Sequence, residues 1–121
     1  MTPDTPPGNL ARLTLPALVA QWARIVDYVE REVVAPHDYL IDLMVRHEIS
    51  QRLRAKPTTL ETREMLAEID ALFRAATVER PSCLHGDDRA AAEQWTSGRE
   101  WYFWRAPLHG SPLLGATADA G

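Results

Sequence analysis

The sequence predicts an all-α protein: a small antiparallel helical bundle of three main helices and a short fourth helix, followed by an extended aromatic C-terminal segment. Apolar residues recur every three or four positions along three long stretches, which is typical of amphipathic helices. Short connections between these stretches favour antiparallel packing of successive helices. The composition, 45% hydrophobic and 25% charged residues over 121 positions, is that of one ordinary globular domain and excludes disordered and fibrous chains.

The first helix is expected over residues 14–34. Thr14 suits the N-cap position, and Pro16 falls in the first turn, where its missing N–H costs little. Pro36 disfavours the helical conformation of the residue before it, so the helix should break there. The apolar face consists of Leu15, Leu18, Val19, Trp22, Ile25, Val26, Val29 and Val33.

The second helix is expected over residues 37–55 and the third over residues 58–76. Lys56 and Pro57 end the second helix, whose buried stripe steps by four residues. Thr58, followed three residues later by Glu61, matches a capping box and predicts the start of the third helix. The two apolar faces are Ile41, Val45, Ile49 and Leu53 in the second helix, and Met65, Leu66, Ile69, Leu72, Phe73 and Ala76 in the third.

The remainder of the domain is expected to be less regular. Residues 77–88 are predicted to form a loop, followed by a short alanine-rich helix over residues 88–97 that ends at Gly98. The next residues are predicted to be extended, which places Trp101 and Phe103 on one face and Tyr102 and Trp104 on the other.

The predicted domain covers residues 13–110, between a flexible N-terminal arm at residues 1–12 and a frayed tail at residues 111–121. Three prolines and one glycine within residues 3–8 support the arm, and small residues without periodicity support the tail. The first residues lack the pattern of a secretory signal, and no stretch is apolar enough for a membrane span. Cys83 is the only cysteine, so an intramolecular disulfide is impossible. We therefore expect a soluble, cytoplasmic protein that does not bind membranes.

The aromatic segment is the strongest functional candidate, because five of the nine aromatic residues lie within residues 95–104. Tryptophan, tyrosine and arginine are enriched at the energetic centres of protein interfaces. One alternative is a clamp on the core that buries Trp101 and Phe103, and another is base stacking on single-stranded nucleic acid. The net charge of −4 makes nucleic acid an improbable partner and suits a basic protein better. The predicted partner-binding residues are Arg99, Trp101, Tyr102, Trp104 and Arg105.

A second candidate is the sequence RPSCLH, in which four residues separate Arg80 from His85. This spacing resembles the arginine and histidine motif of the HEPN ribonucleases, a family of small helical proteins. The resemblance covers six residues. It implies that Arg80 stabilises the transition state and that His85 acts as acid or base on the RNA phosphodiester. Pro81 and Gly86 predict a loop where that family has a helix.

The remaining chemically active residues do not predict an enzyme. His37 and His47 are ten residues apart, a spacing that does not place two imidazoles on one metal ion, so we expect no metal and no cofactor. Cys83 lies close to His85 in sequence, yet a thiol nucleophile also needs an electropositive setting and an oriented base. Asp38, Asp42 and Glu48 are assigned to the polar face of the second helix.

The most fitting function is therefore binding and inhibition of a partner protein, as in toxin immunity proteins, antitoxins and phage-encoded antagonists. Small size, acidity and the missing catalytic motif support this class. The alternatives are a HEPN-like ribonuclease using Arg80 and His85, and a structural homodimer closed by the aromatic segment.

Overall fold

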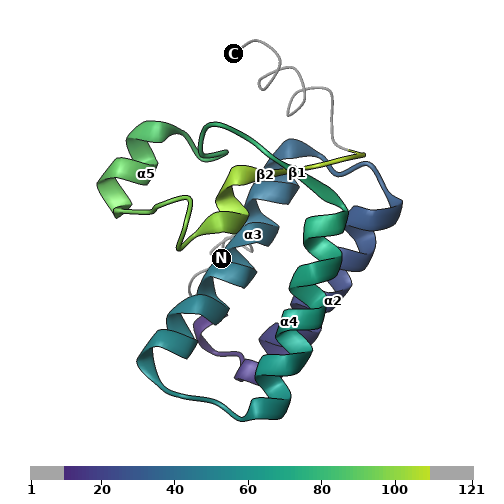
Figure 1. Cartoon of the computed structure of the whole chain (residues 1–121), viewed down its shortest axis with the longest axis vertical. Helices are drawn as coiled ribbons and strands as arrows, with labels where there is room; N and C mark the ends of the chain where they lie inside the picture. The colour runs from purple at the N-terminus through teal and green to yellow at the C-terminus, as the bar shows by residue number, and fades with distance from the viewer. Residues whose placement is uncertain (1–9, 110–121) are drawn as a thin grey trace.

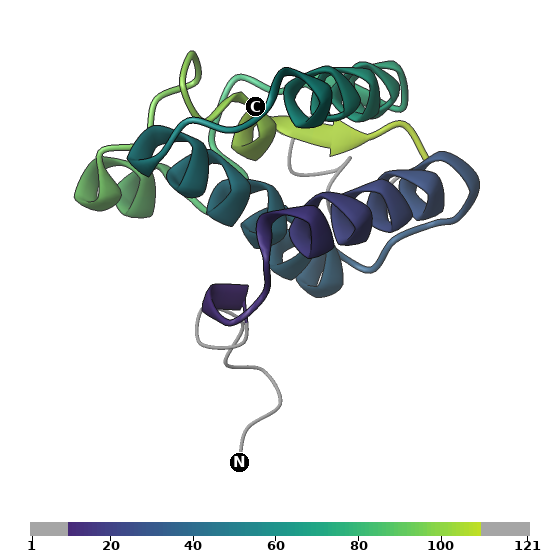
Figure 2. The ribbon, with the colours of Figure 1, turned by 90° about the horizontal axis from the view of Figure 1, so that it is seen from below.

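Three long helices form the body of the protein in this computed structural model, which describes residues 10–109. In Figure 1, α2 and α4 run upwards and α3 runs downwards, so successive helices are antiparallel as predicted. Seen from below, α3 lies between α2 and the short helix α5 (Figure 2). The described elements are α2 (Leu15–Arg31), α3 (Pro36–Ala55), α4 (Leu60–Ala75), β1 (Thr77–Glu79), α5 (Asp87–Glu93), the 3-10 turn η1 (Trp101–Trp104) and β2 (Arg105–Pro107).

The predicted helices are present, and their ends differ by a few residues from the prediction. Thr14 caps α2, because its Oγ1 accepts a hydrogen bond of 3.2 Å from the N–H of Ala17. Helix α2 ends at Arg31, and Pro36 occupies the first position of α3 instead of lying before it. The capping box predicted at Thr58 does not form: Thr59 caps α4, one residue later. All of these shifts lie at the helix ends, which the apolar periodicity constrains least.

Two predictions beyond the third helix are wrong. Helix α5 ends at Glu93 because Gln94 adopts the left-handed conformation, with φ of 61°, so the predicted extension to residue 97 is absent. The aromatic segment is not extended: the N–H of Phe103 donates to the carbonyl of Glu100 over 3.0 Å, as in a 3-10 turn. The turn directs the adjacent Tyr102 and Phe103 side chains into the core, whereas a strand would place them on opposite faces.

A small antiparallel sheet, absent from the prediction, joins residues expected to form a loop to the end of the aromatic segment. Thr77 pairs with Pro107, and Glu79 pairs with Arg105. The fold is therefore mostly helical with a two-stranded sheet, a partial confirmation of the all-α class. The pairing continues past the strands, because the N–H of Arg80 donates to the carbonyl of Trp104 over 2.7 Å. This contact brings the two sequence motifs side by side.

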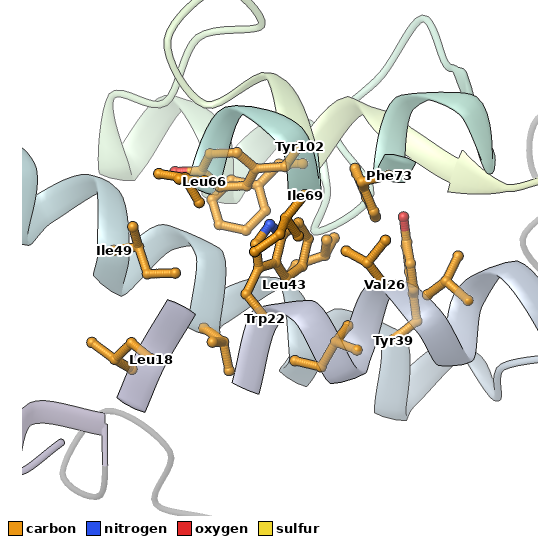
Figure 3. Packing of buried hydrophobic residues seen from close by; sticks show 14 of the residues in the cluster. Leu18, Trp22, Val26, Tyr39, Leu43, Ile49, Leu66, Ile69, Phe73 and Tyr102 are labelled. Atoms are coloured by element: carbon orange, nitrogen blue, oxygen red, sulfur yellow. The ribbon is translucent and has the colours of Figure 1, made fainter. Parts of the chain in front are cut away.

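One cluster of buried hydrophobic residues connects the helices, the sheet and η1. Figure 3 shows Trp22 of α2, Leu43 of α3 and Ile69 of α4 near its centre. The indole of Trp22 donates to Asp70 over 2.9 Å, and Arg46 binds both carboxylate oxygens of Asp70 at 3.0 and 2.9 Å. The carboxylate of Asp70 on α4 therefore links α2, through Trp22, and α3, through Arg46.

The predicted N-terminal arm is only partly described by the structure. Leu10 is buried, and the guanidinium of Arg52 donates to the carbonyls of Leu10 and Ala11 at 3.0 and 3.2 Å. Residues 10 and 11 therefore pack on α3, which contradicts a free arm at this point. The rest of the arm, residues 1–9, and the predicted tail lie outside the described residues. Between residues 10 and 109, no helix is both long and apolar enough to cross a membrane.

Candidate functional site

The four aromatic residues of η1 divide into two inner and two outer side chains. Tyr102 and Phe103 are completely buried, whereas Trp101 and Trp104 are half-buried. Residues three apart eclipse one another in a 3-10 turn, so the two tryptophans share its outer side. The segment packs on the core, as the clamp alternative expected, but the predicted buried pair is wrong: Tyr102 and Phe103 are buried, instead of Trp101 and Phe103.

Trp101 is engaged by the rest of the fold. Its ring lies 5.9 Å from the ring of Phe73, measured between centroids. The guanidinium carbon of Arg74 lies 3.8 Å from the centroid of the Trp101 ring, which is a close cation–π contact. Because Arg74 occupies this ring, Trp101 offers a partner less free aromatic surface than its exposure indicates.

Tyr102 does not face solvent, contrary to the predicted partner contact. Its hydroxyl lies 2.8 Å from Nδ1 of His47, and this hydrogen bond is buried. Burial, the largest cause, raises the pKa of Tyr102 to about 12. The guanidinium of Arg46 lies 5.3 Å from the ring centroid. Tyr102 therefore fixes η1 against α3 and cannot bind a partner in this conformation.

The two arginines of the predicted site hold the segment in place. Arg105 donates from Nε to Oγ1 of Thr77 over 2.8 Å, and from Nη2 to the carbonyls of Thr77 and Arg74 at 3.1 and 3.2 Å. Arg99 donates to the buried carboxylate of Glu100 over 2.5 Å and keeps a side chain that is 54% exposed. Arg105 therefore serves the fold, whereas Arg99 remains within reach of a partner.

Trp104 lines an open pocket of about 360 Å³ together with Glu79, Arg80, Pro81 and Ser97. A backbone hydrogen bond from the Arg80 N–H to the Trp104 carbonyl holds these two pocket residues next to each other. Nε of Arg80 is buried and has no hydrogen-bond partner in the described part of the chain. Buried donors almost always find an acceptor, so this nitrogen needs an explanation. We call this group of five residues the Trp104 pocket.

The ribonuclease alternative requires Arg80 and His85 to act on one phosphodiester. His85 does not line the Trp104 pocket, and its Nε2 is buried without a partner among residues 10–109. Its ring lies 5.6 Å from Trp95 and 5.0 Å from Phe103 between centroids. Residues 80–86 form a loop and not the helix that the resemblance implies. His85 is half-buried and packs on these two rings, away from the Trp104 pocket, so the structure does not bring it together with Arg80 in one site.

Two imidazoles pack on the same aromatic rings: His47, which is buried, and His85, which is half-buried, both lie against Trp95 and Phe103. Burial first, then Arg89 and His47, lower the pKa of His85 to about 4. Burial also lowers the pKa of His47, against the opposing charge of Glu100. Both rings are therefore neutral at pH 7. Protonation of either ring at lower pH reduces the free energy of unfolding, because the unfolded chain binds the proton more readily.

We expect the free energy of unfolding to fall in acid because of His85. The unfolded chain takes up this proton below about pH 6.5, whereas the folded chain does so only near pH 4, so stability is lost between these values. The predicted loss is about 2 kcal/mol, after allowance for partial exposure of the ring. Asp42 opposes it, because burial raises the pKa of Asp42 to about 6 and lets the folded chain bind a proton there.

Urea titrations of the wild type and His85→Phe at pH 7 and pH 4 separate the two contributions, because both proteins contain Asp42. The stability difference between wild type and variant should shift by about 2 kcal/mol toward the variant at pH 4. Parallel pH profiles would show that His85 does not carry the effect.

Other candidates from the sequence show no assembled chemistry. Cys83 is buried, and burial raises the pKa of its thiol, which disfavours the nucleophilic thiolate. Over residues 10–109, no three histidine, cysteine, aspartate or glutamate side chains are grouped to hold a metal ion.

Comparison with protein-family models, curated protein sequences and solved structures found no match to this chain. The candidate site therefore rests on its own geometry. Sequence reasoning identified Trp104 and Arg80 separately, but missed Glu79, Pro81 and Ser97 and missed that all five residues meet. Strands of three residues are too short to show a periodicity that would have revealed the pairing.

Proposed function

We propose that this protein is a small cytoplasmic protein that binds another protein and inhibits it, with the contact centred on Trp104. The observation that carries the proposal is the Trp104 pocket, where a half-buried indole lies beside an arginine with an unpartnered buried nitrogen. Tryptophan and arginine dominate the binding energy of protein interfaces because each combines a large contact area with polar groups.

The backbone that carries Trp104 is held in place by the fold, which favours binding. Phe103 precedes Trp104 and is fully buried, and the carbonyl of Trp104 accepts the hydrogen bond from Arg80. A contact residue fixed before binding loses little conformational entropy when the complex forms. We assign Arg99 and Trp101 to the rim of the surface, and Tyr102 and Arg105 to its support.

The inhibitory role is inferred from size and charge. A chain of 121 residues with a net charge of −4 is compatible by size and charge with the immunity-protein and antitoxin class, and its acidity suits a basic partner. Long-range attraction would accelerate the encounter, and the Trp104 pocket would supply the specific contact.

Site-specific photocrosslinking in the host cell tests the proposal. A benzophenone amino acid at position 97, in the pocket, should crosslink one protein in a fixed ratio, whereas the same group at position 28 should not. Tyr28 is a suitable control because it is an aromatic residue, 47% exposed, on α2. Crosslinks between two copies of this chain would instead identify the structural homodimer.

Trp104→Ala is expected to weaken the purified complex about tenfold or more, because a central aromatic contact is lost. Tyr28→Ala should leave the dissociation constant unchanged. Isothermal titration calorimetry with the crosslinked partner measures both. Unchanged affinity of the Trp104 variant would place the interface elsewhere.

A further inference from the structure

We infer that the exposed side of α4 is a second docking surface, which receives a basic amphipathic helix of the partner protein. The surface consists of Glu61, Met65, Glu68 and Leu72, and we call these four residues the α4 stripe. The inference rests on the proposed binding of a basic partner and concerns a surface other than the Trp104 pocket.

The α4 stripe runs along one side of the helix, because its residues follow one another at steps of four, three and four. Met65 is 49% exposed and Leu72 is 50% exposed, although the apolar periodicity placed both in the core. Glu61 and Glu68 are also exposed. The stripe covers three turns, about 16 Å at 1.5 Å per residue. In Figure 2, α4 (teal) lies along the upper edge of the body formed by the long helices.

The carboxylates on this side of α4 have no basic partner. Helices α2 and α3 each pair an acidic side chain with the arginine four residues later, at 2.7 and 2.8 Å. Within residues 10–109, the side chains of Glu61, Glu64 and Glu68 form no ion pair. Glu64 and Glu68 are four residues apart, so two like charges are neighbours on the helix surface, which destabilises the isolated helix.

The arginines of α4 do not neutralise the stripe. Arg63 and Arg74 each lie two positions from a stripe residue, and residues two apart do not face each other on a helix. The guanidinium of Arg74 is instead stacked on the ring of Trp101. The stripe therefore presents negative charge and apolar surface only.

The stripe does not stabilise the protein on its own. Placing Glu61 in the first turn favours the helix through its dipole, but Glu68 lies beyond the reach of this effect. Exposed large apolar side chains beside unpaired like charges are a local conflict, and such conflicts are expected at functional sites. A partner that covers the apolar side chains and supplies positive charge removes both costs.

Charge complementarity selects the occupant. Nucleic acids and anionic lipids are repelled by the glutamates. A second copy is also disfavoured: if Met65 and Leu72 of two copies packed together, Glu68 would lie opposite Glu68 in either helix orientation. A helix with lysine or arginine beside its apolar residues matches the stripe, because the apolar stems of these side chains lie on Met65 and Leu72 while their charges reach the carboxylates.

NMR titration of the full chain tests the inference without knowledge of the partner. The probe is a helical peptide of about 15 residues, built from alanine and lysine, with two leucines seven residues apart to match Met65 and Leu72. One control peptide has alanine in place of both leucines, and the other has glutamate in place of every lysine. We expect saturable shifts of the Met65 and Leu72 methyl signals with the leucine–lysine peptide, weaker ones with the alanine control and none with the glutamate control.

Other results would overturn the assignment. Equal responses to the glutamate control would show that charge has no part, and equal responses to the alanine control would show that the apolar residues have none. Methyl shifts that depend on protein concentration without peptide would identify a second copy as the occupant. Absence of a saturable shift at the stripe would show that α4 is not a docking surface for such a helix.

Variants separate the apolar contribution from the charged one. Leu72→Gln should weaken binding of the leucine–lysine peptide about fivefold. Glu68→Gln should weaken it about threefold at low salt and have little effect at about 0.5 M salt. Leu60→Gln is the matched control, because Leu60 is 64% exposed on the same helix but lies off the stripe. Its affinity should equal that of the wild type, and thermal unfolding shows whether each variant is folded.

The two proposals fail in different ways. A benzophenone amino acid at position 64, beside the stripe, should crosslink the same partner as the one at position 97. If position 97 crosslinks a partner, position 64 does not, and the peptide gives no response, the binding function stands and the α4 inference is wrong. If Trp104→Ala retains the partner while Leu72→Gln loses it, the contact proposed at Trp104 fails and the α4 stripe is supported.

Discussion

Replacing Asp70 by alanine is expected to lower the free energy of unfolding by about 3–5 kcal/mol, the cost of leaving a buried charge unpaired. The side chains of Arg46 and Asp70 are 8% and 15% exposed, so the guanidinium would lose its counterion where water cannot replace it. The indole N–H of Trp22 would also lose its acceptor. Urea denaturation at pH 7 measures the loss.

A matched control distinguishes burial from the mere presence of an ion pair. Arg31 and Asp27 form a pair of similar length, 2.7 Å, but their side chains are 61% and 59% exposed. Asp27→Ala should therefore have little effect on stability, because water screens and solvates both groups. The double variant Arg46→Met with Asp70→Leu should recover much of the stability lost by Asp70→Ala, since it leaves no unpaired charge. Equal losses for Asp70→Ala and Asp27→Ala would contradict this explanation.

Phe103→Ala is expected to cost about 3–5 kcal/mol, as large-to-small substitutions in a packed core do. Its ring centroid lies 4.3 Å from that of Trp95, 5.0 Å from that of His85 and 5.2 Å from that of His47. Removing it leaves a cavity among four aromatic side chains, including Tyr102 at 4.8 Å. Calorimetry or chemical denaturation measures this loss of stability. The circular dichroism spectrum of the variant at low temperature should be unchanged, which shows that its helices are still formed.

The adjacent residue provides the comparison that matters for function. Trp104→Ala removes a larger side chain from the surface of the same turn, and we expect it to cost much less stability than Phe103→Ala. A surface residue that contributes little to folding but much to binding is what the proposed function requires. If Trp104→Ala destabilises the fold as strongly as Phe103→Ala, Trp104 serves the core and the binding proposal is weakened.

The main helices could be predicted because their signals are local. Thr14, Pro16 and the apolar residues between Leu15 and Val29 act within a few turns, and the structure places α2 where they indicate. The aromatic turn could not be predicted in this way. Its conformation depends on burying Tyr102 against His47 and Phe103 against Trp95, and these contacts link parts of the chain that the local pattern does not connect.

The residues of the candidate site could likewise be predicted only in part from the sequence. The sequence identified Trp104 by aromatic composition and Arg80 by its spacing from His85, and gave them different roles. Pairing of β1 with β2 brings Arg80 to Trp104, while His85 turns inward among aromatic rings. The pair suggested by sequence proximity is therefore separated, and a pair 24 residues apart is joined.

The sequence by itself determined the mostly helical class and the order of the main helices, because periodicity and capping act over one or two turns. It did not fully determine the buried faces, since Val33, Met65 and Leu72 were predicted to be apolar-face residues and are exposed. Only the tertiary structure decided which aromatic side chains are buried and which arginines are already paired. Those properties depend on burial and on acceptors supplied by distant segments: Asp70 for Arg46, Thr77 for Arg105, and none for Nε of Arg80 within residues 10–109.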